Sequence, residues 1–250
     1  MSVYLTVFLK NSMKCHLCSH EKKLIKAHVI PEKFFTPLRS EKKSPILCSN
    51  IKGKYSKRSP IGIYDSTILC SECDNYIGIW DNYAQQLLLK GFDESLAVYQ
   101  GPENVFYKIN SFDYEKLKLF FISVLWRAAI SNHSFFKRIK LGPYQNEIKE
   151  MILNADPGTP EKYPVVIAKF RDPNMTAFLD PHNDKFDGIN FYRFYMTGFV
   201  IYIKVDKRET PQFLKDFYIR KNQPICILLR DLHNSKDGKI MVDIAKHYLR

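Results

Sequence analysis

Two Cys-x-x-Cys pairs, Cys15/Cys18 and Cys70/Cys73, constrain the fold of this chain more than any other feature of its sequence. Zinc prefers four ligands in a tetrahedron, and a Cys-x-x-Cys turn presents two thiolates at a suitable separation. A single pair is also typical of a redox motif, but two pairs in one chain favour a metal. We therefore predict that these four cysteines bind one structural zinc ion.

The other candidate ligands are less well placed, although one alternative stays open. His16 and His20 lie close enough to the first pair to replace a cysteine, which would give a mixed cysteine and histidine site. Cys48 and Cys226 have no partner at a metal-binding spacing. Six cysteines, most of them in metal spacing, are not typical of a secreted disulfide framework, so we expect a reducing compartment.

The chain has 250 residues and is 45% hydrophobic, which is enough to bury a full core. It could form one large domain or a small metal-stapled module joined to a larger one, and the zinc motif favours the second arrangement. No stretch reaches the roughly 18 apolar residues of a membrane helix, and the apolar run at residues 3–9 lacks a basic lead and a cleavage site. We expect a soluble cytoplasmic protein with no membrane partner.

The formal net charge of +12 is distributed unevenly along the chain. Residues 10–58 carry 13 Lys and Arg against 3 acidic residues, whereas residues 60–107 carry one Lys against 7 acidic residues. This order is typical of an enzyme that holds a polyanion with lysines and binds a divalent cation with carboxylates. A solvated lysine-rich loop beside an acidic helix would show the same charges.

Two short segments on the amino-terminal side predict strands. One is the apolar run at residues 3–9. The other is the run at residues 24–30, which is partly β-branched, is stopped by Pro31 and contains His28. We therefore expect the imidazole of His28 to be carried on a strand.

The second cysteine pair opens a predicted helix at residues 71–90, which Gly91 ends. Asp74 and Asp81 share one face of this helix, because seven residues at about 100° each place them within about 20° of each other. Gly78 lies between them and leaves that face open to a ligand.

The remaining chain predicts an α+β body. Residues 112–130 are apolar around nearly the whole helical circumference, which indicates a central helix. Arg127 within it would need a partner if buried, and we favour a structural ion pair over a phosphate contact. Thr197 and Gly198 predict a hairpin turn. The other predicted elements are helices at residues 145–154 and 211–218, strands at residues 165–170, 190–196, 199–205 and 225–229, and a terminal segment at residues 242–249.

Three strings match a known family: Cys15-x-x-Cys18, His28-Val29-Ile30-Pro31 and Asp65-x-x-x-Leu69-Cys70-x-x-Cys73-Asp74. Together they resemble the HNH, or ββα-metal, nuclease superfamily in its four-cysteine, treble-clef form, over roughly residues 13–90. The chain is also similar to bacterial HNH-like proteins, some of them in mobile-element or phage-defence settings. The resemblance implies a zinc-knuckle ββα-metal module at residues 1–110, followed by an α+β accessory body of unassigned role at residues 111–250.

The resemblance also implies an activity, the hydrolysis of phosphodiester bonds by an endonuclease, with DNA as the expected substrate. His28 matches the general base, and one Mg²⁺ or Mn²⁺ ion would stabilise the scissile phosphate and the leaving oxygen. Asp65 and Asp81 are expected to bind this cation and are assigned with His28 to catalysis, and Asp74 is a further candidate ligand. Asp65 and Asp74 could instead cap the turn and the helix beside the second cysteine pair.

Ala27 stands where many family members place an Asp or His ligand, so a ligand must come from elsewhere. If catalysis has been lost, the chain would act as a zinc-knuckle nucleic-acid-binding or protein-adaptor module, which is the alternative function. A protein partner in a multi-component system is compatible with either function, the endonuclease or the binding module. Four basic residues are expected to hold phosphates without reading bases, namely Lys52, Lys54, Lys57 and Arg58.

Overall fold

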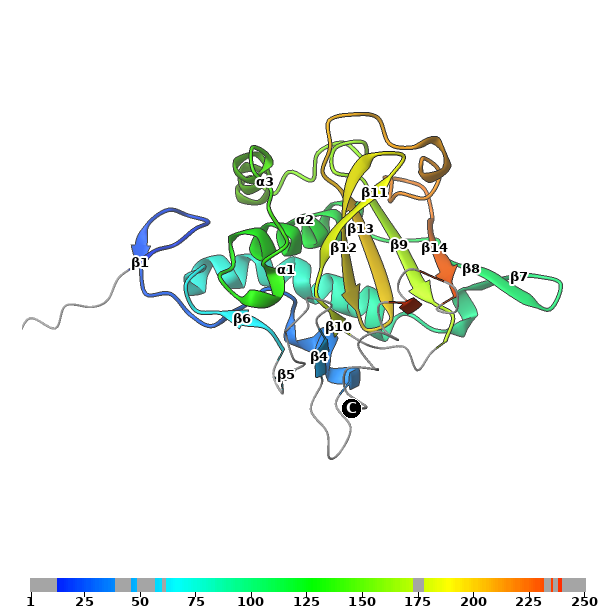
Figure 1. Ribbon diagram of the computed structural model, residues 1–250, viewed down its shortest axis with the longest axis horizontal. Helices are drawn as coiled ribbons and strands as arrows, with labels where there is room; N and C mark the ends of the chain where they lie inside the picture. Colours follow the sequence, from blue (N-terminus) through cyan, green and yellow to red (C-terminus); the bar gives the residue numbers. More distant parts are fainter. Residues whose placement is uncertain are drawn as a thin grey trace, which may run out of the picture.

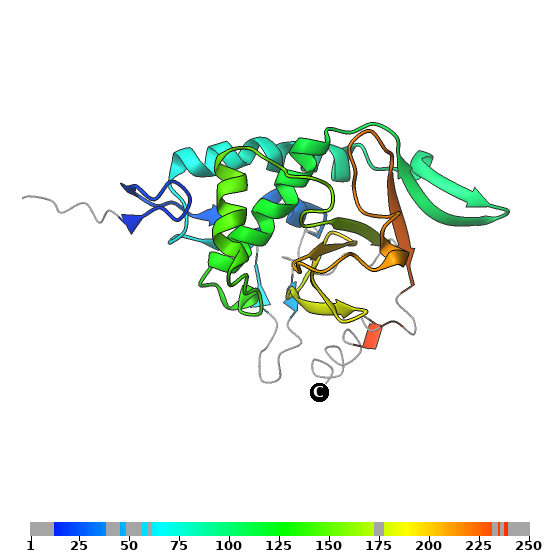
Figure 2. The same ribbon diagram turned by 90° about the horizontal axis from the view of Figure 1, so that it is seen from above.

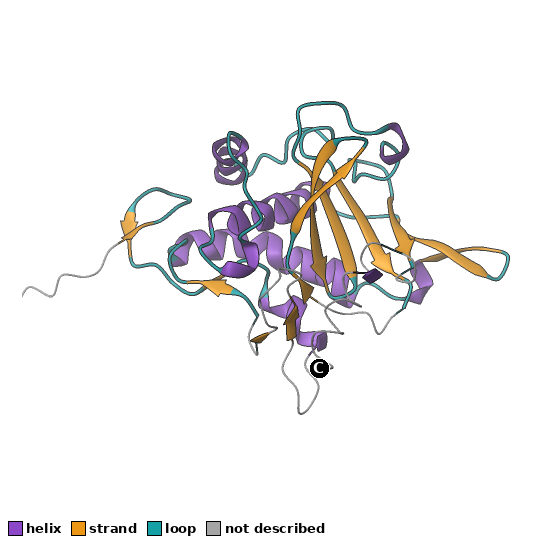
Figure 3. Cartoon of the chain, viewed as in Figure 1, coloured by secondary structure: helices purple, strands orange, loops and turns teal. Residues whose placement is uncertain are grey.

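The computed structural model describes residues 13–38, 46–48, 57–59, 62–172, 178–231, 235 and 238–239. The predicted strand at residues 3–9, the terminal segment at residues 242–249, and Lys52 and Lys54 lie outside these described residues. Within them the chain is a mixed α+β structure, as predicted (Figure 3). The described helices are too short or too polar to cross a membrane.

Three helices pack in series: α1 (Ser71–Gln85) on α2 (Tyr114–Ile130), and α2 on α3 (Tyr144–Leu153). The chain continues beyond α1 as a π-helical turn, η2 (Gln86–Lys90), so the predicted helix at residues 71–90 is confirmed. Most of α2 is buried, as its all-round apolar pattern predicted. The Asp113 carboxylate accepts a hydrogen bond from the Lys116 amide and caps the start of α2.

A seven-stranded sheet forms the second layer, in the order β11-β12-β13-β9-β14-β8-β7 (Figure 1). All neighbours in this sheet are antiparallel except β14 and β9, which are parallel. The strands are β7 (Ala97–Gln100), β8 (Glu103–Ile109), β9 (Val165–Phe170), β11 (His182–Phe186), β12 (Ile189–Met196), β13 (Phe199–Lys204) and β14 (Ile225–Arg230).

Both faces of the central strands are buried. On β13, Ile201 and Ile203 belong to the larger core, which also contains residues of α1 and α2, whereas Val200 and Tyr202 belong to a second core on the opposite face. This division follows from the period of two in a strand. Helices α1 and α2 therefore cover one face of the sheet (Figures 1 and 2).

The turn between β12 and β13 is the predicted hairpin. Thr197 and Gly198 both have positive φ, 52° and 82°, as a two-residue turn between twisted strands requires. Positive φ is uncommon for a β-branched residue. The Thr197 hydroxyl donates a hydrogen bond to the Phe34 carbonyl, which ties the sheet to the amino-terminal segment.

Short strands and 3-10 turns make up the amino-terminal segment and several later connections. Strands β1 and β2 pair antiparallel, as do β3 and β6, and β10 and β5 flank β4. The elements are β1 (Met13–Lys14), β2 (Glu21–Lys22), β3 (Ala27–His28), β4 (Ile46–Cys48), β5 (Lys57–Arg58), β6 (Tyr64–Asp65), β10 (Phe178–Leu179), and the 3-10 turns η1 (Glu32–Leu38), η3 (Glu94–Leu96), η4 (Ser134–Phe136) and η5 (Gln212–Leu214).

Some of the described elements differ from the predicted ones. Strands β7 and β8 and strand β11 were not expected. The helix predicted at residues 211–218 is reduced to η5, because Tyr218 forms a β-bridge with Val166 and the chain becomes extended there. Strand β8 pairs with β14, and one buried core runs across residue 110, the predicted boundary between the two parts.

Candidate metal centre and active site

The four cysteine sulfurs of the two pairs converge on one point. All four Sγ atoms lie within 4.8 Å of one another, and Cys18 Sγ is 4.0 Å from Cys70 Sγ. Zinc–sulfur bonds of about 2.3 Å in a tetrahedron place the sulfurs about 3.8 Å apart. The cluster therefore has the donor type, number and spacing to hold a structural metal ion such as zinc.

Backbone hydrogen bonds build the first half of the cluster. Cys15 lies in the turn between β1 and β2, where its amide donates to the His20 carbonyl (2.9 Å) and its carbonyl accepts from the Ser19 amide (2.9 Å). Ser19 takes a left-handed conformation, with φ 63°, to close this turn. The His16 amide then donates to the Ile68 carbonyl (2.9 Å), which holds the turn against the second pair.

The second half of the cluster is the start of α1. Cys70 is the N-cap residue of this helix and Cys73 lies in its first turn. Leu24 forms a β-bridge with Cys70, so the chain after the first pair also contacts the second. His16 and His20 do not belong to the ligand group, which contains cysteines alone among the described residues.

The thiols of the cluster have unequal acidity. Burial acts to raise the pKa of Cys15, but hydrogen bonds from the backbone amides of Cys70, Cys18 and Leu17 outweigh it and lower this pKa to about 7. Burial raises the pKa of Cys73. A bound metal ion would supply positive charge to these thiolates, and metal binding and folding are coupled at such sites.

The ribbon of β3 and β6 carries the other predicted site residues. Ala27 is paired with Asp65, and His28 is paired with Tyr64. Paired residues share a face and adjacent residues alternate, so Asp65 and His28 face opposite sides of the ribbon. His28 is half-buried, and its ring contacts the edge of Tyr64 with 6.2 Å between centroids.

Asp65 is held by four hydrogen bonds to its carboxylate. Oδ1 accepts from the Thr67 amide (2.9 Å) and hydroxyl (2.6 Å). Oδ2 accepts from the Ser131 hydroxyl (2.8 Å) and the Asn132 amide (2.8 Å). A carboxylate has about four acceptor positions, so these donors occupy the group. Asp65 therefore joins β6 to the end of α2, in place of the expected role as a cation ligand, and this agrees with the structural alternative.

We expect Asp65→Ala to lower the free energy of unfolding by about 2–4 kcal/mol, because it leaves several half-buried donors without an acceptor. Burial acts to raise the pKa of Asp65, but the hydrogen bonds from Thr67, Ser131 and Asn132 outweigh it and lower this pKa. The stabilisation is therefore complete above about pH 4, the unfolded value, and is lost as the pH falls through the lower folded value. Urea denaturation across this range measures the difference.

Asp93 provides the matched control. Its carboxylate accepts from the Ser95 amide and hydroxyl in the same local pattern, but it is exposed. Asp93→Ala should lower the free energy of unfolding by about 1 kcal/mol. Equal losses for the two variants would contradict the structural role of Asp65.

The Asp81 carboxylate is also bound, in this case by Arg127 of α2. Arg127 Nη2 donates to Asp81 Oδ1 (2.7 Å), and Nη1 donates to Asp81 Oδ2 (2.9 Å) and to the His28 carbonyl (2.8 Å). The side chain of Arg127 is 1% exposed and that of Asp81 is 15% exposed. The structural ion pair predicted for Arg127 is confirmed, and Asp81 is its partner rather than the helix-borne cation ligand that was expected.

Asp74 is the remaining acidic candidate. Burial raises the pKa of its carboxyl, and the charges of Arg127 and His28 act in the opposite direction. Among the described residues, none donates a hydrogen bond to this carboxylate. Asp74 therefore differs from Asp65 and Asp81 in keeping its oxygens available to a ligand.

The three carboxylates predicted to bind a divalent cation, Asp65, Asp74 and Asp81, do not form a ligand group among the described residues. Within the part of the chain that the structure describes, no group of three His, Cys, Asp or Glu residues other than the four cysteines lies within metal-binding distance. Lys57 and Arg58 form β5, but their side chains are not among the described ones. No protein-family model matches this chain, and neither curated proteins nor solved structures give a significant match.

Two features of this site were not predicted from the sequence. Arg127 was expected to be structural, but its partner was not identified, although an arginine and an aspartate on two neighbouring helices were the available signal. It also did not identify Ser131 and Asn132, which directly follow α2 and bind Asp65. The local sequence around a polar residue at a helix end does not indicate a hydrogen-bond partner 66 positions away.

Proposed function

We propose that this chain is an HNH-like endonuclease that hydrolyses phosphodiester bonds in nucleic acid, with DNA as the expected substrate and His28 as the general base. The observation that carries the proposal is the setting of His28. It lies on a two-stranded ribbon beside the cysteine cluster, and Arg127 joins its carbonyl to Asp81 of α1. This order of ribbon, cluster and helix is the one that the resemblance implies.

A hydrogen bond from α2 fixes the main chain of His28. Arg127 binds the His28 carbonyl, and the carboxylate of Asp81 fixes Arg127 through two hydrogen bonds. Arg127 and Asp81 are therefore positioning residues, because they act on the reaction only through the placement of His28. Such support matters because a displacement of about 1 Å can slow an enzyme about a hundredfold.

In the proposed reaction, the imidazole of His28 accepts a proton from the attacking water. Asp74 is the residue that would hold a divalent cation, which would supply positive charge to the phosphate. Mg²⁺ commonly binds through one or two carboxylates with substrate phosphates and water, so a single open carboxylate is compatible with this role. The net charge of +12 would favour encounter with a polyanion.

We expect His28→Ala to reduce cleavage by about a hundredfold to ten-thousandfold, the usual contribution of a general base. Nicking of supercoiled plasmid in Mg²⁺ or Mn²⁺, with EDTA as the blank, measures the rate. Zinc content should stay at the wild-type value, because His28 is not in the cysteine cluster.

His20→Ala is the matched control, since His20 is an exposed histidine beside the cluster and outside the ligand group. It should retain both zinc and cleavage. Equal rates for wild type and His28→Ala would reject His28 as the base.

A nucleic-acid-binding or adaptor module is the second candidate function. It is favoured by the commitment of Asp65 and Asp81 to structural contacts, and by Ala27 at the usual ligand position. A gel-shift titration beside the nicking assay separates the two functions. Binding with no nicking in either metal would support the adaptor.

A further inference from the structure

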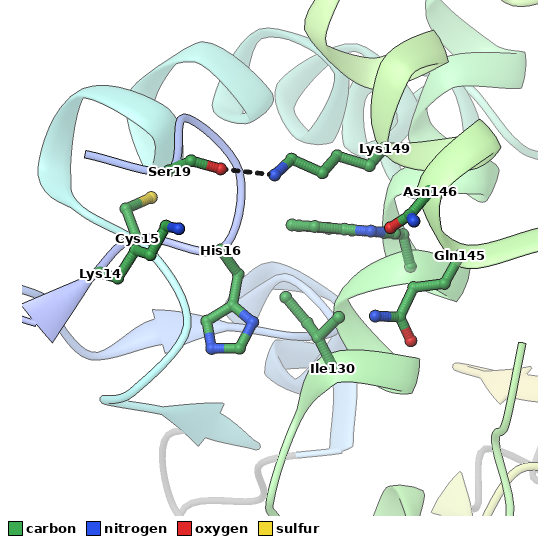
Figure 4. A pocket seen from close by; sticks show the side chains of 9 residues that line it. Lys14, Cys15, His16, Ser19, Ile130, Gln145, Asn146 and Lys149 are labelled. Carbon is green, nitrogen blue, oxygen red and sulfur yellow. Dashed lines mark hydrogen bonds between the residues drawn. The ribbon is translucent and has the colours of Figure 1, made fainter. Parts of the chain in front are cut away.

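A cavity of about 360 Å³ lies between the first cysteine turn, the end of α2 and the start of α3 (Figure 4). Its volume is at the lower end of the roughly 300–1,000 Å³ that is typical of small-ligand sites. The residues that define its chemistry are Lys14, His16, Trp126, Gln145, Asn146 and Lys149. The proposed function makes no use of this cavity.

The cavity is separate from the face of the ribbon that carries His28. Ile130, which lines the cavity, directly precedes the Ser131 that binds Asp65. Asp65 and His28 face opposite sides of the ribbon. A ligand in the cavity would therefore lie on the Asp65 side.

The lining is rich in hydrogen-bond donors and positive charge. Lys14 and Lys149 line the cavity, and no aspartate or glutamate does. Lys149 extends from α3 toward the cysteine turn, where its Nζ donates to Ser19 Oγ (2.7 Å) (Figure 4). This bond fixes one ammonium at the rim and leaves its other hydrogens for a ligand.

Trp126 adds a donor that lacks an acceptor. Its side chain is 1% exposed and lines the cavity, and its Nε1 hydrogen has no hydrogen-bond partner among the described residues. Leaving a buried donor unsatisfied costs about 1–3 kcal/mol, so such a group commonly indicates a ligand or water. An acceptor-rich ligand at this wall would satisfy it.

We propose that this cavity binds the phosphate of a nucleotide unit, either a free mononucleotide or the phosphorylated end of a strand. The two lysines provide the charge, and the polar groups of His16, Gln145 and Asn146 provide further hydrogen bonds. The cavity has room for more than a phosphate, which favours a nucleotide over the free ion. Cys15 of the cluster also lines the cavity, and a zinc ion held by four thiolates would carry a formal charge of −2, which opposes the charge of the two lysines. The zinc-loaded protein is therefore the form to test.

Calorimetric titration of the zinc-loaded chain tests the proposal with five probes. They are a nucleoside 5′-monophosphate, the matching nucleoside, inorganic phosphate, and a short oligonucleotide with either a 5′-phosphate or a 5′-hydroxyl. The phosphorylated member of a pair should bind about tenfold or more tightly than its unphosphorylated partner, as expected for charge-assisted hydrogen bonds. Tighter binding of the mononucleotide indicates a free ligand, and tighter binding of the phosphorylated oligonucleotide indicates a strand end.

Lys149→Gln should weaken binding of the phosphorylated probe about tenfold, whereas Lys90→Gln, which removes the same charge from an exposed lysine on η2, should not. In a Trp80→Phe background Trp126 is the only tryptophan, so its emission should change on titration. Equal affinity for phosphorylated and unphosphorylated probes would overturn the proposal. So would equal affinity of the two lysine variants, or binding that leaves the Trp126 emission unchanged.

Discussion

Cys70→Ser is expected to abolish zinc binding and to unfold the amino-terminal segment around the cluster. Four sulfurs within 4.8 Å of one another hold two stretches of chain that are 52 positions apart between Cys18 and Cys70. Structural zinc sites in small peptides contribute roughly 10–16 kcal/mol of apparent binding free energy, which is comparable to the roughly 5–15 kcal/mol stability of a whole domain. The loss of one thiolate should therefore destabilise this segment strongly.

Metal analysis and amide hydrogen exchange measure this outcome. We expect stoichiometric zinc in the wild type, and loss of zinc together with loss of protection at residues 13–28 and 62–73 in the variant. Cys226→Ser is the control, because Cys226 lies on β14 outside the cluster. This variant should keep both its zinc and its protection from exchange. Full zinc content and unchanged protection in Cys70→Ser would show that the cluster is not the metal site.

Arg127→Met is expected to lower the free energy of unfolding by about 3–5 kcal/mol. The substitution leaves the Asp81 carboxylate without its two hydrogen bonds, and an uncompensated buried charge is far more costly than a lost surface pair. It also removes the donor to the His28 carbonyl, so we expect the proposed cleavage activity to fall with little change in zinc content. Chemical denaturation gives the stability, and the plasmid assay gives the activity.

The exposed pair of Arg171 and Asp231 is the matched control. Its side chains are 46% and 68% exposed. Arg171→Met should therefore lower the free energy of unfolding by less than about 1 kcal/mol. The double variant Asp81→Leu/Arg127→Met should recover part of the stability lost in Arg127→Met, because no charge is then left alone. Similar losses for the Arg127 and Arg171 variants, or no recovery in the double variant, would contradict a buried ion pair.

Local signals were sufficient for much of the secondary structure. The spacing of the cysteines predicted their association, because a Cys-x-x-Cys turn fixes the distance between its own two sulfurs. Helices α1, α2 and α3 followed from apolar periodicity, and the strand at His28 followed from the β-branched run that Pro31 stops. The strands β7 and β8 were missed because half-exposed, partly polar residues give a weak period of two.

The roles of the acidic residues could not be obtained in the same way. Asp65, Asp74 and Asp81 are chemically identical, and their spacing was equally compatible with a cation site. The packing of α2 against α1 distinguishes them. It brings Arg127 to Asp81, and Ser131 and Asn132 to Asp65.

The sequence by itself therefore determined the donor set of the metal cluster and the elements that carry His28 and the acidic residues. These depend on neighbours a few positions away, whose geometry the backbone fixes. Only the tertiary structure decided which carboxylates are engaged and which one stays open, and it alone assembled the cavity beside Trp126. Those outcomes depend on donors 46 to 67 positions away, and nothing in a local pattern specifies which distant side chain a buried charge will meet.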